Sequence, residues 1–236
     1  MNSIDSIVIS VVIPCYNEKD FIKEIIDRVL AAPGVKKEII VIDDCSRDGT
    51  VDILKNEIEP MVKKVIYHSQ NMGKGAAVRS ALSEVTGDVV IIQDADLEYD
   101  PAEYEILLRP ILENKADVVY GSRFIGGEEH RVLYFWHMVG NRFLTLLSNM
   151  FTNVNMTDVM TCYKVFKREV LDQIKLKENR FTFDTEITAK VTKMKCRIYE
   201  VGISYSGRTY QEGKKIGWRD GFHTLWCIFK YNILNT

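Results

Sequence analysis

The chain contains 236 residues, which is enough for one large domain or two small ones. Its apolar share of 46% and charged share of 27% are those of a folded soluble protein and exclude a disordered chain. The formal net charge of −2 at pH 7 provides no basic field, so we predict no nucleic-acid partner. No uninterrupted apolar run approaches the roughly 20 residues that span a bilayer.

The cysteines indicate a reducing compartment. They are odd in number, lie far apart and form no C-x-x-C pair, which argues against both a disulfide scaffold and a zinc site. The N-terminal residues lack the basic region and cleavage site of a secretory signal. We therefore expect a cytoplasmic protein. The five cysteines are Cys15, Cys45, Cys162, Cys196 and Cys227.

Strand-like and helix-like segments alternate along residues 7–124. The run "IVISVVIP" is continuous and β-branched, as in a strand buried on both faces. The following "KDFIKEIIDRVLAA" has apolar residues at helical spacing and ends at a Pro-Gly pair. Further strands are expected at 37–44, 63–69, 87–96 and 116–124, and further helices at 49–58, 73–85 and 100–114. This alternation predicts an α/β fold with a mostly parallel sheet and helices on both faces.

After residue 124 the alternation breaks. We expect a helix at 130–151, a short strand near 161–166, a helix near 184–194, a strand within 196–208 and an amphipathic segment at 218–234. No repeat or linker divides the chain, so we predict one domain over residues 1–236. One side of the 130–151 helix carries Trp136, Val139, Phe143, Leu146, Leu147 and Met150. The other side carries His137, Asn141, Thr145 and Ser148.

Polar clusters follow each expected strand of the first half. They are "PCYNE", "DDCSRDGT", "QNMGKG", "QDADLE" and "GSRF", in chain order. Each cluster alone is typical of turns and helix caps. The carboxyl ends of parallel strands share one edge of a sheet, where open α/β folds bind ligands. Five clusters in succession therefore predict a single binding cleft.

The stretch "VVIIQDADLEYDP" concentrates acids at the end of an expected buried strand. Asp94 and Asp96 are two residues apart and point the same way from an extended chain. Such close like charges favour an intervening cation, and oxygen donors without His or Cys favour Mg²⁺ or Mn²⁺. Alternatives are a carboxylate pair for glycoside hydrolysis and a helix N-cap. The cap suits Asp100, which precedes a proline, so we assign Asp94, Asp96 and Glu98 to the metal.

The glycines at "GKGAA" form neither of two common nucleotide motifs. Both G-x-x-x-x-G-K-[ST] and G-x-G-x-x-G are absent from the chain, so neither an ATPase nor a dinucleotide enzyme is supported. A Gly-Lys-Gly turn that enters a helix still offers backbone N–H groups and one positive charge to a nucleotide.

Taken together, the motifs resemble those of family 2 glycosyltransferases with a GT-A fold. The resemblance is greatest to the branch that transfers sugars to dolichyl or polyprenyl phosphate, such as dolichol-phosphate mannosyltransferases. It runs from about residue 8 to about residue 215. It implies a nucleotide-sugar-binding half at about 1–124 and an acceptor-binding half at about 125–236. The motifs are "VVIPCYNE", "VIDDCSRDGT", "NMGKGAAVRSAL", "QDADLEYDP", "VVYGSRF" and "TCYKVFKREVL".

The resemblance implies a role for the residues after the first two strands. Tyr16 matches the aromatic residue that packs on the donor's base, and Glu18 matches the acid near its ribose. Pro14 belongs to the same donor-binding segment. Asp44 matches the acid that accepts from the base edge, whereas its neighbour Asp43 is equally compatible with a structural role. A carboxylate at this position accepts from uracil or guanine alike.

A second group of residues matches the family's contacts to the diphosphate. Gly73 and Lys74 lie where the family contacts the nucleotide, and Asp94, Asp96 and Glu98 match the D-x-D metal motif. Lipid-phosphate mannosyltransferases often carry Gln at the last of these positions, and Glu98 keeps an oxygen ligand there.

Basic residues of the second half match the family's contacts to the leaving group and the acceptor. Arg123 of "GSR" matches a residue that faces the acceptor phosphate. Arg208, Lys214 and Lys215 resemble a mobile basic loop that closes on the diphosphate. Lys214 and Lys215 are also compatible with a solvated turn.

The family displaces the nucleoside diphosphate in line and inverts the anomeric carbon. An anionic lipid phosphate requires no strong general base, whereas a hydroxyl acceptor does. Glu186 matches the base of hydroxyl-transferring relatives, although an acid near a helix N-terminus is also favourable against the dipole. The Q-x-x-R-W motif of processive synthases is absent, which favours transfer of a single sugar.

The two aromatic-rich segments at 130–151 and 218–234 have two interpretations. An apolar stripe at helical spacing is typical of a core helix. Trp, Phe and Tyr beside Arg and Lys also suit a helix in the lipid headgroup layer, where lipid-phosphate relatives place such helices. We expect a hexosyltransferase that uses a UDP- or GDP-sugar, such as UDP-glucose or GDP-mannose, and a polyprenyl phosphate at the cytoplasmic membrane face. A hydroxyl acceptor, or a non-catalytic nucleotide-sugar-binding subunit, is the alternative.

Overall fold

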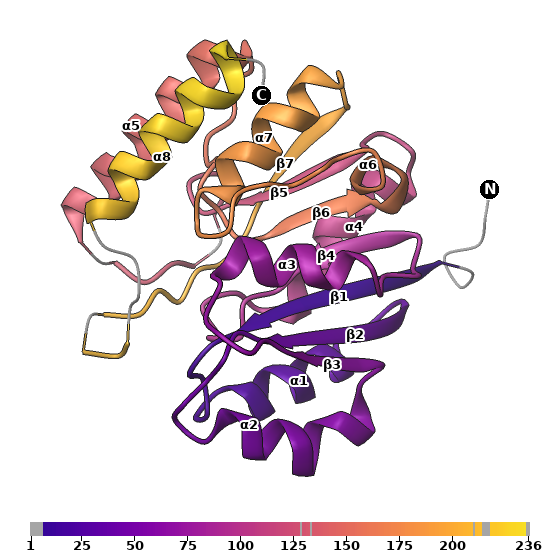
Figure 1. The fold of residues 1–236 in the computed structure, drawn as a ribbon. Helices are drawn as coiled ribbons and strands as arrows, with labels where there is room; N and C mark the ends of the chain where they lie inside the picture. Colours follow the sequence, from indigo (N-terminus) through magenta and orange to yellow (C-terminus); the bar gives the residue numbers. More distant parts are fainter. Residues whose placement is uncertain (1–6, 128, 133, 210, 214–217, 235–236) are drawn as a thin grey trace.

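The computed structural model describes residues 7–127, 129–132, 134–209, 211–213 and 218–234. One seven-stranded sheet runs through them in the order β3-β2-β1-β4-β6-β5-β7 (Figure 1). All neighbouring strands are parallel except β6, which is antiparallel to both β4 and β5. This confirms the predicted mostly parallel α/β sheet. The strands are β1 (Val8–Cys15), β2 (Lys36–Asp43), β3 (Lys64–Tyr67), β4 (Val89–Ile92), β5 (Val118–Ser122), β6 (Lys164–Lys167) and β7 (Ile198–Gly202).

Helices cover both faces of the sheet because successive strand residues point to opposite sides. Along β1, Val11 and Ile13 pack with α1 and α4 residues, whereas Val12 packs on the other face with α3 and α7 residues. The helices are α1 (Ile22–Ala31), α2 (Thr50–Ile53), α3 (Lys74–Leu82), α4 (Tyr104–Leu112), α5 (Phe135–Thr152), α6 (Arg168–Leu171), α7 (Phe183–Lys193) and α8 (Trp218–Ile233). A π-helical turn (Leu54–Ile58) and 3₁₀ turns (Glu59–Met61 and Pro101–Glu103) complete the set.

Two predicted boundaries differ from the structure. The helix expected at 130–151 begins at Phe135, because the preceding residues pair with another segment. His130 forms an isolated parallel bridge with Tyr205, and the backbone N–H of Arg131 donates to the Tyr205 carbonyl at 2.8 Å. The strand expected near 161–166 begins at Lys164. Cys162, just before it, donates its N–H to the hydroxyl of Tyr99 instead of to a strand, at 3.2 Å.

Helices α5 and α8 lie side by side beyond α7, at the upper left of Figure 1. The buried α5 side chains are Leu144 and two polar residues, Thr145 at 4% exposed and Ser148 at 1% exposed. The apolar stripe faces outward, so the interpretation of it as core is wrong. Exposed apolar residues of the pair, hereafter the outer apolar face, are Phe135, Trp136, Val139, Phe143, Leu146, Met150, Phe151, Phe222, Trp226, Phe229 and Ile233. Within the described ranges, every helix is too short or too polar to cross a membrane.

Candidate functional site

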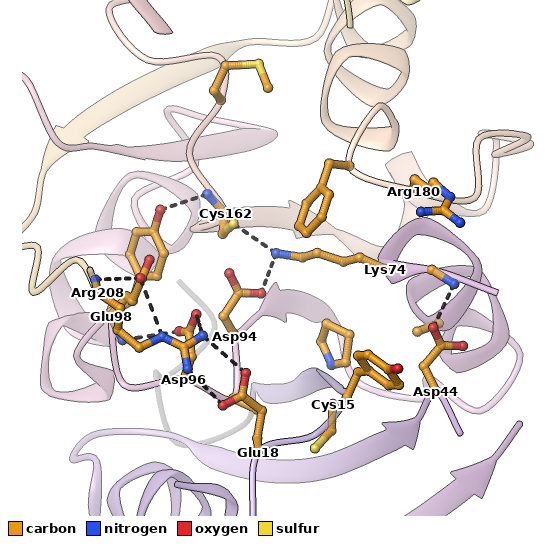
Figure 2. A pocket seen from close by; sticks show the side chains of 18 of the residues that line it. Cys15, Glu18, Asp44, Lys74, Asp94, Asp96, Glu98, Cys162, Arg180 and Arg208 are labelled. Carbon is orange, nitrogen blue, oxygen red and sulfur yellow. Dashed lines mark hydrogen bonds and ion pairs between the residues drawn. The ribbon is translucent and has the colours of Figure 1, made fainter. Parts of the chain in front are cut away.

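A cavity of about 340 Å³ lies where β1, β2 and β4 end (Figure 2). It gathers residues from all five of the strand-end clusters, as expected for carboxyl ends that share one sheet edge. The predicted site residues that line it are Pro14, Tyr16, Glu18, Asp44, Gly73, Lys74, Asp94, Asp96, Glu98, Arg123 and Arg208. Asp100 does not line it and instead caps the following turn, since its carboxylate accepts the Ala102 N–H at 3.0 Å.

Each of the two aspartates of the D-x-D motif pairs with a cationic side chain. Lys74 forms an ion pair with Asp94 and also donates to the thiol of Cys162 at 2.8 Å. Arg208 lies 2.9 Å from Asp96. Figure 2 shows Lys74 and Arg208 reaching these acids from opposite sides of the cavity. The motif therefore lies between two positive charges from segments far apart in the sequence.

Arg208 has further acidic partners. It donates to both oxygens of Glu18, at 3.0 and 3.2 Å. Its backbone N–H donates to Glu98 at 2.8 Å, and Glu98 also accepts from the hydroxyl of Tyr205 at 2.8 Å. The 203–209 segment is thus attached to the acidic cluster by backbone and side chain together.

Burial and the neighbouring charges shift the pKa values of Asp94 and Asp96 in opposite directions. Burial, together with the charges of Asp94 and Glu98, raises the pKa of Asp96 to about 7 against the opposing effect of Arg208. Burial also disfavours ionisation of Asp94, but the nearby Lys74 outweighs it and lowers the pKa of Asp94. A further positive charge near Asp96 would therefore stabilise its ionised form.

The donor set fits a hard divalent cation by its chemistry. Four carboxylates face two cationic side chains, which leaves a formal surplus of two negative charges. All of these ligands are oxygens, as Mg²⁺ and Mn²⁺ prefer. Among the described residues no three acidic, His or Cys side chains are already arranged around one point, and Lys74 and Arg208 pair with two of the acids. The carboxylates are Glu18, Asp94, Asp96 and Glu98, and the cations are Lys74 and Arg208.

Asp44 lies at the other end of the cavity and is firmly oriented. Its side chain is 5% exposed and accepts from His68 Nδ1 at 2.7 Å. It also accepts the backbone N–H groups of Met72 at 2.9 Å and Gly73 at 2.7 Å. Gly73 has a φ of 95° and no room for a Cβ, which would lie 2.5 Å from the Asn179 carbonyl. Glycine is therefore required at the turn that Asp44 holds.

Arg123 enters the cavity as one half of an ion pair. It binds Asp158 in a bidentate manner, at 2.6 Å from Nε and 2.8 Å from one terminal nitrogen. Its guanidinium also lies 5.1 Å from the centre of the Tyr205 ring. Asp158 is fully buried, and its backbone N–H donates to Glu200 at 3.1 Å. These contacts fix the direction in which Arg123 points.

Glu186 does not fit the general-base prediction. It is fully buried and does not line the cavity. Its carboxylate accepts the backbone N–H groups of Lys177 and Glu178 at 2.7–3.0 Å and pairs with Lys190 at 2.5 Å. These contacts fasten the 177–178 segment to α7. Lys214 and Lys215 lie outside the described residues.

Several lining residues were not predicted from the sequence as site residues. Asn141 and His137 face the cavity from the polar side of α5, and their spacing of four residues was visible in the helical pattern. Cys162, Tyr205 and Arg180 enter from irregular segments. No sequence signal marked these three, because their position depends on long-range packing.

The fold has solved relatives. The chain is similar to glucosyl-3-phosphoglycerate synthase from Mycobacterium tuberculosis, solved with Mn²⁺, UDP and glucosyl-3-phosphoglycerate, at 19% identity and a TM-score of 0.75. The match covers 96% of this chain and 80% of the other. A second structure of that enzyme, with Mn²⁺, UDP and phosphoglyceric acid, gives a TM-score of 0.76 over 97% and 79% of the two chains. At this identity the likeness shows the GT-A fold.

Sequence comparison adds relatives of higher identity. A dolichol-phosphate mannosyltransferase of Pyrococcus furiosus is 27% identical over 88% of this chain and 60% of its own length. An undecaprenyl-phosphate 4-deoxy-4-formamido-L-arabinose transferase of Pseudomonas syringae is 31% identical over 74% of this chain and 52% of its own length. The chain thus spans between about half and two thirds of the length of these relatives. Residues 10–175 match the model of Glycosyl transferase family 2, and the chain belongs to that family.

Proposed function

We propose that the chain transfers a single sugar from a nucleoside-diphosphate sugar to a polyprenyl phosphate, with inversion at the anomeric carbon. The observation that carries this proposal is the layout of one cavity. Acids and cations suited to a metal-bound diphosphate lie beside Arg123, which is suited to a second phosphate. The relatives named above, a dolichol-phosphate and an undecaprenyl-phosphate sugar transferase, agree with it.

The donor occupies the end of the cavity at β1 and β2 in this proposal. Tyr16 packs on the base, Glu18 lies near the ribose, and Asp44 accepts from the base edge. Asp94, Asp96 and Glu98 hold Mg²⁺ or Mn²⁺, which supplies positive charge to the diphosphate. Lys74 binds the same diphosphate directly. Arg208, which pairs with Asp96 in this structure, would pair with the diphosphate in the loaded site.

The acceptor phosphate binds between Arg123 and α5. One of its anionic oxygens attacks the anomeric carbon, the bond to the nucleoside diphosphate breaks, and Lys74 and Arg208 stabilise the negative charge on the departing group. The attacking oxygen carries no proton, so no general base is required. The burial of Glu186 away from the cavity is compatible with this acceptor and leaves that residue without a part in the reaction.

The outer apolar face supports a lipid acceptor. Trp136 is 78% exposed on α5, which lines the cavity through His137 and Asn141, and Trp226 is 58% exposed on the adjoining α8. A contiguous exposed apolar surface marks an interaction site, and aromatic residues suit the headgroup layer of a membrane. We propose that α5 and α8 rest on the cytoplasmic surface of a membrane and present Arg123 to the lipid phosphate.

An acceptor panel tests the proposal. Purified protein is incubated with Mn²⁺, labelled UDP- and GDP-sugars and, in detergent, polyprenyl phosphate, polyprenol or a water-soluble glycan. Label is expected in the phosphate-bearing lipid alone. Label in polyprenol or in the soluble glycan, with none in polyprenyl phosphate, would instead establish a hydroxyl acceptor.

A further inference from the structure

Most of the hydrogen-bond acceptor positions of the Asp44 carboxylate are occupied by donors of the protein itself. A carboxylate only accepts hydrogen bonds and offers about four acceptor positions, two on each oxygen. Oδ1 accepts from His68 Nδ1 at 2.7 Å and from the Met72 N–H at 2.9 Å. Oδ2 accepts from the Gly73 N–H at 2.7 Å. In the described part of the chain no other donor reaches the carboxylate of Asp44, since the side-chain amide of Asn71 donates to the Asp44 backbone carbonyl instead, at 3.2 Å. One acceptor position therefore remains on the carboxylate, and it is on Oδ2.

His68 fixes this arrangement from outside the cavity. Its side chain is 6% exposed, and its second ring nitrogen lies 2.9 Å from the hydroxyl of Ser80 on α3. The ring is held between α3 and Asp44, so the carboxylate cannot turn without breaking a buried contact. The two backbone donors belong to the turn that leads into Lys74, which further ties Asp44 in place.

The nucleobases differ in the number of donors that they offer to such a carboxylate. The imide edge of uracil has one N–H, at N3. The corresponding edge of guanine has two donor groups, N1–H and the exocyclic amine, which together need both oxygens of a carboxylate. A polar group that is desolvated without a partner costs free energy, so a site built for one donor rejects a ligand that brings two.

We infer that the donor site takes a uracil nucleotide in preference to a guanine nucleotide, because Asp44 has one acceptor position left. This inference rests on the proposed function, in which Asp44 meets the base of the donor, and it specifies that donor as a UDP-sugar. Pro14, Tyr16 and Asn71 line the same cavity, and Asn71 donates to the backbone carbonyl of Asp44 at 3.2 Å.

Direct binding measurements test the inference without catalysis. Isothermal titration with Mn²⁺ compares UDP, GDP and two methylated forms of UDP. Methylation at N3 removes the single N–H, whereas methylation at C5 leaves it and serves as the matched control. We expect UDP and 5-methyl-UDP to bind alike, and GDP and N3-methyl-UDP to bind at least tenfold more weakly. GDP binding as tight as UDP, or equal binding of the two methylated forms, would overturn the inference.

A pair of variants assigns the preference to Asp44. The Asp44→Asn variant presents an amide in place of one carboxylate oxygen, and we expect its UDP-to-GDP affinity ratio to fall at least tenfold. Both affinities are measured on one preparation of each variant, so a misfolded fraction of the protein does not affect their ratio. Asp100→Asn, which keeps a good helix cap outside the cavity, should leave the ratio unchanged. An unchanged ratio in Asp44→Asn would overturn the assignment.

The outcomes separate this inference from the proposed function. Tighter GDP binding, with transfer to polyprenyl phosphate intact, removes the inference alone. A preference for UDP without any lipid product keeps the inference and removes the acceptor proposal. If none of the nucleotides binds, both are overturned.

Discussion

The guanidinium of Arg208 lies 2.9 Å from the carboxylate of Asp96, although the two residues are 112 positions apart. The arginine therefore lies among the carboxylates that we assign to a divalent cation. It neutralises part of their charge and joins the 203–209 segment to the end of β4. The cation and the Arg208 side chain compete for Asp96. Cation binding is therefore expected to be linked to movement of this segment.

Removal of the Arg208 side chain should strengthen metal binding and weaken nucleotide binding. A charge-assisted hydrogen bond contributes about 1.5–3 kcal/mol, so the loss of this competitor should raise the Mn²⁺ affinity of Arg208→Gln about tenfold or more. UDP binding in the presence of Mn²⁺ should fall, because the diphosphate loses one cation. Titration with Mn²⁺ followed by electron paramagnetic resonance measures the first effect.

The control for that variant is Arg197→Gln, which removes a surface ion pair with Asp117 away from the cavity. It should leave the Mn²⁺ affinity unchanged. Weaker Mn²⁺ binding by Arg208→Gln would show that the arginine supports the cation rather than competing with it.

The raised pKa of Asp96 predicts how stability depends on pH in metal-free protein. Burial raises this pKa from about 4 in the unfolded chain to about 7. Between these values the folded protein binds more protons than the unfolded chain, so this residue's contribution is lost as pH rises from about 4 to 7. Asp96→Asn should therefore gain stability relative to the wild type as pH rises. The difference in unfolding free energy between the two proteins should shift in favour of Asp96→Asn by on the order of 2–4 kcal/mol between pH 4 and pH 8. Urea unfolding at both pH values measures this difference, and a difference independent of pH would refute the assignment.

Glu186→Gln should affect stability rather than catalysis. Its carboxylate accepts two backbone N–H groups and pairs with Lys190 in a fully buried position, so its loss should cost about 1–3 kcal/mol of unfolding free energy. Transfer to polyprenyl phosphate, measured on folded protein, should stay within a few-fold of the wild type. A hundredfold loss of activity with unchanged unfolding free energy would restore the general-base role.

Charges on the outer apolar face should weaken membrane binding. Trp136 and Trp226 are exposed, so Trp136→Glu and Trp226→Glu should leave the unfolding free energy nearly unchanged. Flotation with vesicles that contain anionic lipid should show reduced binding for both variants. Leu30→Glu is the matched control, because Leu30 is 43% exposed on α1, away from α5 and α8. Equal flotation of all variants would contradict the proposed contact.

The strand-end residues of the first half could be predicted to meet, because parallel strands end at one edge of the sheet. Asp44, Gly73 and Asp96 follow three different strands and line one cavity for this reason. The GT-A fold was predicted from the same motifs, and the sheet confirms it. The capping role of Asp100 could also be predicted, because an acid that precedes a proline is typical of the start of a helix.

Contacts that depend on long-range packing could not be predicted. The helical pattern of α5 separates two faces, but it does not indicate which face turns inward, and the polar Thr145 and Ser148 are buried beside Leu144. A lone histidine at position 68 carries no signal for its contact with Asp44. Glu186 resembled a base in the sequence, but the fold brings residues 177 and 178 back to its carboxylate.

Transfer by the wild type and by Asp96→Asn, compared side by side, tests the central claim most directly. Both proteins are incubated with Mn²⁺, a UDP-sugar and polyprenyl phosphate, and the lipid product is identified by mass spectrometry. The wild type should form polyprenyl-phosphate-linked sugar, and Asp96→Asn should lose at least about a hundredfold of that rate, because electrostatic stabilisation of the leaving group is weakened. Equal rates for the two proteins, or a soluble glycan as the sole labelled product of the wild type, would contradict the account.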